Sequence, residues 1–224
     1  MKQIKRNQKG FTLVEIAIVL VIIGLLLGGV LKGQEMVEGA RIKSVVNDLN
    51  GVSASYNTYI DRYRSLPGDD TAATLTGRGW VGAIAGNGNG VLNLPIANTF
   101  TSAGEQPAFW SQLRAANIAA GDSTATGAAA LPRAGTGGII GVTLGAYAIT
   151  SGPTVCISNL TTAQAAGVDT TLDGKLPANN TGNNVGNARG ARGAAPLAPV
   201  AAIPAASVYN DTAATTPWTL CRQI

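Results

Sequence analysis

An unbroken apolar run near the N-terminus constrains this chain more than any other feature. From Phe11 to Leu31 every residue is apolar, Gly or Thr, except Glu15. As a helix, these residues span about 31 Å at about 1.5 Å per residue, which is the thickness of a bilayer core. The run therefore predicts a single transmembrane helix.

The residues on either side of the run set its orientation. Basic residues without any acid precede it and are expected to hold this end in the cytoplasm; they are Lys2, Lys5, Arg6 and Lys9. A plain signal anchor is one interpretation. A cleaved secretory signal fits poorly, because its apolar core is usually about 7–15 residues and ends at small residues, whereas Lys32-Gly33-Gln34-Glu35 follows here.

Glu15 is unusual for a membrane segment, since a carboxylate there costs about 2.5–3.5 kcal/mol and is usually functional. The stretch Lys9-Gly10-Phe11-Thr12-Leu13-Val14-Glu15 resembles the class III signal of type IV prepilins and pseudopilins. It joins a basic leader, a glycine, a phenylalanine and a glutamate in that family's order.

The resemblance implies that a membrane-bound prepilin peptidase cleaves between Gly10 and Phe11 and N-methylates Phe11. It also implies that the Glu15 carboxylate meets the Phe11 amine of a neighbouring subunit and sets the register of a filament. Pairing would neutralise two charges that an apolar core cannot hold separately. The alternative for Glu15 is a protonated or snorkelling acid near the membrane interface.

Beyond Leu31 the pattern becomes amphipathic, with apolar residues at spacings of three and four. These residues are Ile42, Val45, Leu49, Val52, Tyr56, Tyr59 and Tyr63. The helix is expected to stop near Leu66, before Pro67. Four glycines interrupt the junction of the two halves and permit either close helix contact or local loosening; they are Gly24, Gly28, Gly29 and Gly33.

The predicted organisation has three parts: a cleaved leader over 1–10, a long helix over 11–66 and a head over 67–224. The helix divides into a transmembrane or filament-core part, 11–31, and an amphipathic part, 32–66. The resemblance implies an α+β, type IV pilin-like fold, in which the helix packs on a small antiparallel sheet with long loops.

Within the head, the apolar residues after Pro107 predict a short helix, and 138–150 reads as a bent strand or a hairpin. Val155 to Ile157 continue the strand character. We expect a helical turn at 162–166 and an exposed loop over 178–206. The segment 169–177 resembles one that recurs in pilin-like relatives with long heads, and the alternative prediction is a turn between elements of the head. The connector 119–138 carries little information.

The segment Gly86-Asn87-Gly88-Asn89-Gly90 resembles a glycine-rich loop that carries Asp in some pilin-like relatives, but calcium sites need several carboxylates. Its asparagines favour a tight turn instead. No metal or cofactor is predicted.

The two cysteines, Cys156 and Cys221, lie beyond the membrane segment, where thiols more often pair. A bridge would stabilise the head by about 4 kcal/mol in the chain-entropy model. Many type IV pilins close a C-terminal loop in this way. A redox or metal pair is the alternative, but the spacing is far from C-x-x-C.

The formal charge of +4 comes entirely from the leader. Without its four bases, 12 basic residues face 12 acidic ones, so charge predicts no nucleic-acid partner. The chain has no histidine, which excludes a Ser-His-Asp or Cys-His site, and we expect no enzyme.

The resemblance implies a major or minor pilin that assembles with itself and other pilins through an inner-membrane assembly platform. The precursor would be a single-pass inner-membrane protein with a cytoplasmic N-terminus, and the filament would span the periplasm or be extracellular. A pseudopilin of a type II secretion system is the first alternative. A membrane-anchored extracytoplasmic binding module is the second.

Overall fold

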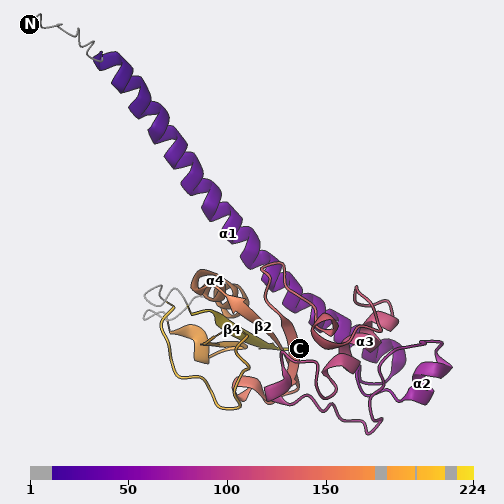
Figure 1. Ribbon diagram of the computed structural model, residues 1–224. Helices are drawn as coiled ribbons and strands as arrows, with labels where there is room; N and C mark the ends of the chain where they lie inside the picture. Colours follow the sequence, from indigo (N-terminus) through magenta and orange to yellow (C-terminus); the bar gives the residue numbers. More distant parts are fainter. Residues whose placement is uncertain (1–11, 175–180, 195, 210–215) are drawn as a thin grey trace, which may run out of the picture. The chain divides into compact units, whose positions relative to one another are not determined.

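A computed structural model of the chain describes residues 12–174, 181–194, 196–209 and 216–224. Its first element is helix α1, Leu13–Tyr63, of 51 residues (Figure 1). The helix runs without interruption through the glycines between Gly24 and Gly33. Two compact units meet within it, the first ending at Gly39 and the second beginning at Ala40.

Within the first unit, α1 is apolar around its circumference as far as Leu31, except at Glu15. Its best 18-residue window has a mean hydropathy of 2.8, none of it is buried, and α1 is long and apolar enough to cross a membrane. Large side chains stand in solvent, from Leu13 at 91% exposed to Val37 at 53%. Such a surface needs a bilayer or other apolar helices around it.

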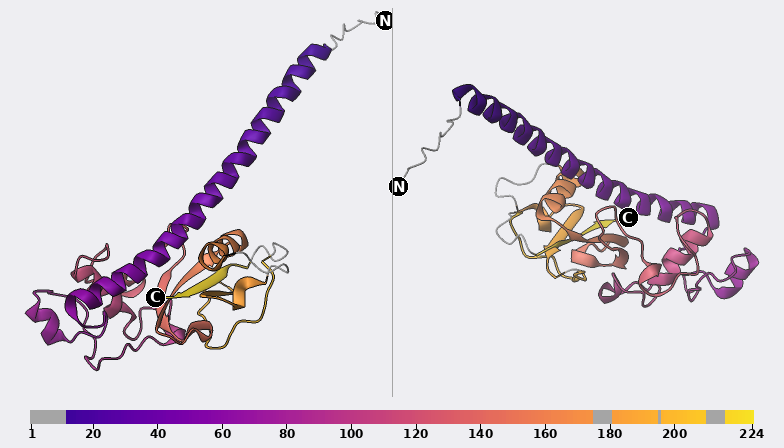
Figure 2. Two further views of the ribbon diagram at one scale, coloured as in Figure 1. Left: turned by 180° about the vertical axis from the view of Figure 1, so that it is seen from behind. Right: turned by 45° about the horizontal axis from the view of Figure 1, so that its top comes forward.

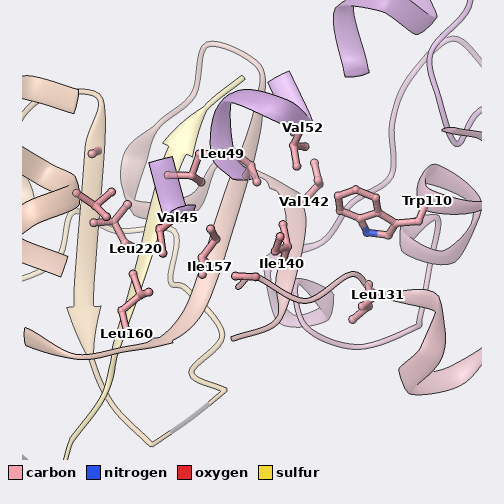
Figure 3. Packing of buried hydrophobic residues seen from close by; sticks show 14 of the residues in the cluster. Val45, Leu49, Val52, Trp110, Leu131, Ile140, Val142, Ile157, Leu160 and Leu220 are labelled. Atoms are coloured by element: carbon pink, nitrogen blue, oxygen red, sulfur yellow. The ribbon is translucent and has the colours of Figure 1, made fainter. Parts of the chain in front are cut away.

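In the second unit α1 packs on the head through the predicted stripe. Val45, Leu49 and Tyr59 are fully buried, and Ile42, Tyr56 and Tyr63 pack partly buried against the same core. Figure 3 shows Val45, Leu49 and Val52 directed at residues of the sheet. The spacing of three and four thus identified the helix face that the head covers.

The head contains one antiparallel sheet of four strands in the order β1-β2-β4-β3. The strands are β1 (Ile140–Leu144), β2 (Pro153–Leu160), β3 (Ala188–Arg192) and β4 (Trp218–Gln223). Figure 2 shows the sheet from behind, with β4 beside β2. A long helix on a small antiparallel sheet is the expected α+β, pilin-like arrangement.

The described part of the head contains three further α-helices: α2 (Ala72–Gly77), α3 (Gln106–Ala115) and α4 (Thr162–Asp173). The structure confirms the helix at Pro107, which occupies the first turn of α3. Phe109 and Trp110 lie in the core, at 0% and 3% exposed. Short 3-10 turns occur at 96–98, 127–130, 146–148 and 182–184.

Several boundaries differ from expectation. Helix α1 ends at Tyr63 rather than near Leu66, because Arg64 already adopts a left-handed conformation with φ of 53°. The turn expected at 162–166 is the start of the twelve-residue α4, which a capping box of Thr161 and Gln164 initiates. The turn predicted over 169–177 is therefore wrong for Asp169 to Asp173, which are helical.

The exposed loop predicted over 178–206 is also partly wrong, because it contains strand β3. Ala188 and Gly190 are buried there, and β3 pairs with β4, a strand that the sequence patterns did not indicate. The reading of 138–150 resolves into β1 followed by a turn at Gly145, which has φ of 73°.

Candidate functional site

The first described residues form a reciprocal cap on α1. The carboxylate of Glu15 accepts the backbone N–H of Thr12 at 2.8 Å and the Thr12 hydroxyl at 2.7 Å. In return, the Glu15 N–H donates to the Thr12 hydroxyl oxygen at 3.3 Å. This is a capping box, which satisfies two donors that the helix itself leaves unpaired.

The cap gives Glu15 a local partner that the interpretation of the sequence missed. Its signal was present as Thr-x-x-Glu immediately before an apolar run. Both bonds from Thr12 go to Oε2 of Glu15, so Oε1 accepts none among the residues that the structure describes. Gly10 and Phe11, the predicted processing positions, lie outside the described residues.

At the other end of α1, a buried polar network joins the helix to the turn Leu66-Pro67-Gly68-Asp69-Asp70. The Asp70 carboxylate accepts hydrogen bonds from the Tyr59 and Ser65 hydroxyls and forms an ion pair with Arg78. Burial and the adjacent Asp70 carboxylate raise the pKa of Tyr59, so its hydroxyl remains a donor. The network fixes the point at which the chain leaves the helix.

Asp69 holds the glycine-rich loop. Its carboxylate accepts the N–H groups of Asn89 at 3.0 Å and Gly90 at 2.8 Å. The Asn87 and Asn89 side chains close turns on their own loop, accepting the N–H groups two residues on. The asparagine oxygens thus serve the turn itself. Across the described ranges, no group of three or more His, Cys, Asp or Glu residues is placed to hold a metal ion.

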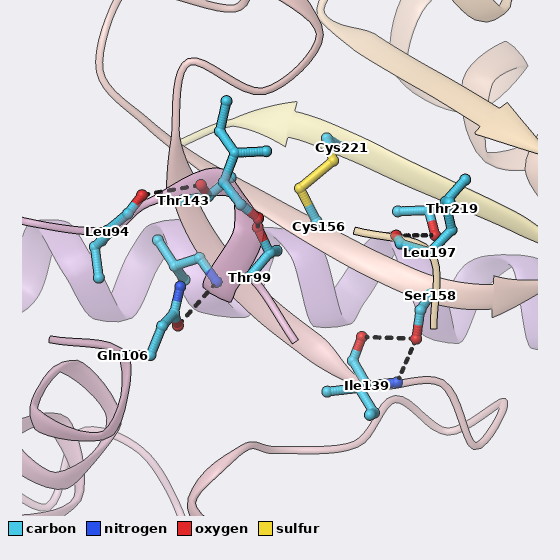
Figure 4. The surroundings of a disulfide bond; sticks show 12 residues. Leu94, Thr99, Gln106, Ile139, Thr143, Cys156, Ser158, Leu197, Thr219 and Cys221 are labelled. Carbon is cyan, nitrogen blue, oxygen red and sulfur yellow. Dashed lines mark hydrogen bonds between the residues drawn. A yellow bond between two sulfur atoms is a disulfide. The ribbon is translucent and has the colours of Figure 1, made fainter. Parts of the chain in front are cut away.

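A disulfide joins Cys156 to Cys221 across the two central strands (Figure 4). Both cysteines are fully buried. Phe100, Ala146 and Tyr147 pack against them in a small second core. Because side chains alternate along a strand, this core lies on the sheet face opposite the one that α1 covers.

A buried acid on α4 lies away from any cation in the described part of the head. Asp169 is 1% exposed and accepts the Tyr209 hydroxyl at 2.6 Å. Burial is the main cause that raises the pKa of Asp169 to about 6, the Tyr209 hydrogen bond opposes it, and the charge of Asp173 adds to it. Asp169 is therefore an acid of the head whose charge responds to mild acidification.

A long apolar helix with a capped glutamate in its first turn, followed by a disulfide-bonded α+β head, is a pilin-like arrangement. The family model of the prokaryotic N-terminal methylation motif matches residues 5–31. This motif is the class III prepilin signal of type IV pilins and pseudopilins. It fits a membrane-anchored precursor and a structural role. No curated protein matches this chain.

Proposed function

We propose that this chain is a structural subunit, a major or minor pilin, of a type IV pilus-like filament. The observation that carries the proposal is the methylation motif over residues 5–31. This motif includes the start of α1, whose first turn contains Glu15. The precursor is inserted in the inner membrane with its N-terminus in the cytoplasm. Prepilin peptidase then cleaves after Gly10 and methylates the amine of Phe11.

In the filament, the Phe11 amine of one subunit pairs with the Glu15 carboxylate of a neighbour. The geometry of the cap supports this role, since Thr12 occupies only Oε2 and a carboxylate accepts about four hydrogen bonds. Oε1 can therefore accept the amine while the cap stays closed. Burial of both charges together costs less than burial of either alone.

Processing is tested by mass spectrometry of the protein purified from membranes. We expect the mature chain to begin with N-methyl-phenylalanine at position 11. An intact Met1, or cleavage at another bond, contradicts the proposal.

Assembly is tested with Glu15→Gln, which keeps an acceptor for Thr12 but removes the charge. We expect the variant to be cleaved and to fail to form filaments. Glu35→Gln is a matched control, since Glu35 is an exposed acid of α1 paired with Lys32, and it is expected to assemble. Normal filaments from Glu15→Gln would rule out the charge pair.

Deletion of the gene for this protein distinguishes a pilus subunit from a type II secretion pseudopilin, because the two differ in the function that is lost. We expect deletion to abolish surface filaments in electron micrographs and to leave the export of folded enzymes unchanged. Loss of export with no change in surface filaments would identify a pseudopilin. A membrane-anchored binding module would show neither loss.

A further inference from the structure

A pocket of about 550 Å³ lies beside the turn that ends α1. Its volume is within the range of small-ligand sites, about 300–1,000 Å³. Ile60 and Leu66 form apolar parts of its lining, and Thr71 and Thr74 contribute hydroxyls. All of its residues belong to the second unit, so the pocket exists within a single subunit.

Arg64 lines this pocket from a strained position. It follows the last residue of α1 with φ of 53°, at the place where helices usually have glycine. Its side chain is exposed, and among the described residues its guanidinium makes neither a hydrogen bond nor an ion pair. A cation with five donors therefore remains available to a ligand.

The two carboxylates of the pocket are not equivalent. The Asp70 carboxylate forms an ion pair with Arg78 and accepts hydrogen bonds from the Tyr59 and Ser65 hydroxyls. Asp69 receives only two backbone N–H groups, and no cation within the described ranges pairs with it. The pocket thus offers one unpaired cation, Arg64, and one anionic acceptor, Asp69.

A ligand that suits this arrangement carries one anionic group for Arg64, neutral hydroxyl donors for Asp69 and the threonines, and C–H groups for Ile60 and Leu66. We propose that the pocket binds a carboxylated sugar, as in the uronic acid residues of an acidic polysaccharide. A planar carboxylate matches the guanidinium fork. A nucleic-acid backbone offers Asp69 only further negative charge. The inference does not rest on the filament, because one subunit contains the whole pocket.

The test measures binding of glucuronate to the purified full-length protein in detergent, by saturation-transfer NMR and by titration. Glucose, which lacks the carboxylate, and acetate, which lacks the hydroxyls, are the comparison ligands, and a single-stranded oligonucleotide is the competitor. Arg64→Gly removes the guanidinium and suits the left-handed backbone. The matched control is Arg62→Gln, since Arg62 is also exposed but does not line the pocket.

We expect glucuronate to bind more tightly than glucose or acetate, and Arg64→Gly to weaken it by about tenfold or more. Arg62→Gln should bind as the wild type does, and Arg64→Gly should melt no lower than the wild type. Absence of glucuronate binding overturns the proposal. The proposal is also overturned if acetate binds as tightly as glucuronate, or if Arg64→Gly leaves the affinity for glucuronate unchanged. It is likewise overturned if the oligonucleotide displaces glucuronate and both arginine variants weaken binding of the oligonucleotide.

Discussion

The side-chain oxygen of Gln112 accepts the backbone N–H of Gly68 at 2.6 Å. The same amide donates to the carbonyls of Asp70 at 3.2 Å and Ile84 at 3.1 Å. Gln112 is fully buried. One side chain of α3 therefore holds both the turn after α1 and the loop that follows α2.

Replacing Gln112 by Leu should destabilise the head strongly. The variant leaves the Gly68 N–H and the Ile84 carbonyl without their partner, whereas the Asp70 carbonyl still accepts the N–H of Gly86. Each buried group without a partner costs about 1–3 kcal/mol. We expect a loss of at least about 2 kcal/mol in the free energy of unfolding, measured by urea denaturation in detergent. Gln223→Leu, at a half-exposed position, is the control and should lose less than about 1 kcal/mol. Equal losses in both variants would contradict the role of Gln112.

Asp169 predicts a particular pH dependence of stability. Its pKa is raised from 3.8 to about 6 in the folded protein, so the folded state keeps a proton that the unfolded chain releases. This group's contribution to stability is therefore complete below about pH 4 and is lost as the pH rises through about 6.

Asp169→Asn should remove this loss while still accepting the Tyr209 hydroxyl. We compare the free energy of unfolding of the variant with that of the wild type at each pH. We expect this difference to favour the variant by up to about 3 kcal/mol more at pH 7 than at pH 4. Urea unfolding at both pH values measures the difference. Asp61→Asn, at an exposed position of α1, should show little change with pH. A wild-type-to-variant difference that is the same at pH 4 and pH 7 would disprove the assignment.

The disulfide should dominate the stability of the head. It closes a separation of 65 residues, for which chain entropy predicts about 4 kcal/mol. We expect Cys156→Ala with Cys221→Ala to lower the free energy of unfolding by roughly that amount, and the native protein to resist alkylation unless it is reduced and unfolded. Alkylation of both thiols without a reductant would show that the bridge is absent.

Gly141 in β1 should not tolerate a side chain. A Cβ built there lies 1.9 Å from the carbonyl oxygen of Thr99, which is backbone and has to shift. Gly141→Ala is expected to cost several kcal/mol, of the order of a severe overpacking defect. Gly51→Ala is the matched control, since no atom lies within 4 Å of a Cβ at this helical glycine.

The control variant Gly51→Ala is itself expected to change stability, in the favourable direction. Ala at position 51 should stabilise α1 by about 1 kcal/mol, because alanine has the higher helix propensity. Thermal unfolding of the two variants side by side compares them. A Gly141→Ala variant as stable as Gly51→Ala would show that the contact with Thr99 is not maintained.

Short-range patterns identified the elements that neighbours along the chain control. The apolar run predicted the membrane-competent part of α1, and spacings of three and four predicted which face of α1 the head buries. Pro107 marked the start of α3. Each of these signals lies within a few residues of the structure that it specifies, so no fold was needed to read it.

The sheet and the pocket were harder to predict from the sequence. β3 has little apolar character, and only pairing with β4 makes Ala188 and Gly190 part of the interior. The pattern over 138–150 did not indicate that the backbone of Thr99 approaches Gly141 closely, as the structure shows. These features depend on partners distant in the sequence.

By itself, the sequence determined the processing signal, the membrane helix and its buried face, because local composition and helical periodicity carry that information. The tertiary structure alone decided that Asp70 pairs with Arg78 and that Arg64 lines a pocket. It also decided that Gln112 would hold a turn 44 residues away. Contacts of that kind form only after loops close, and the pairing of partners across a loop leaves no periodic trace along the chain.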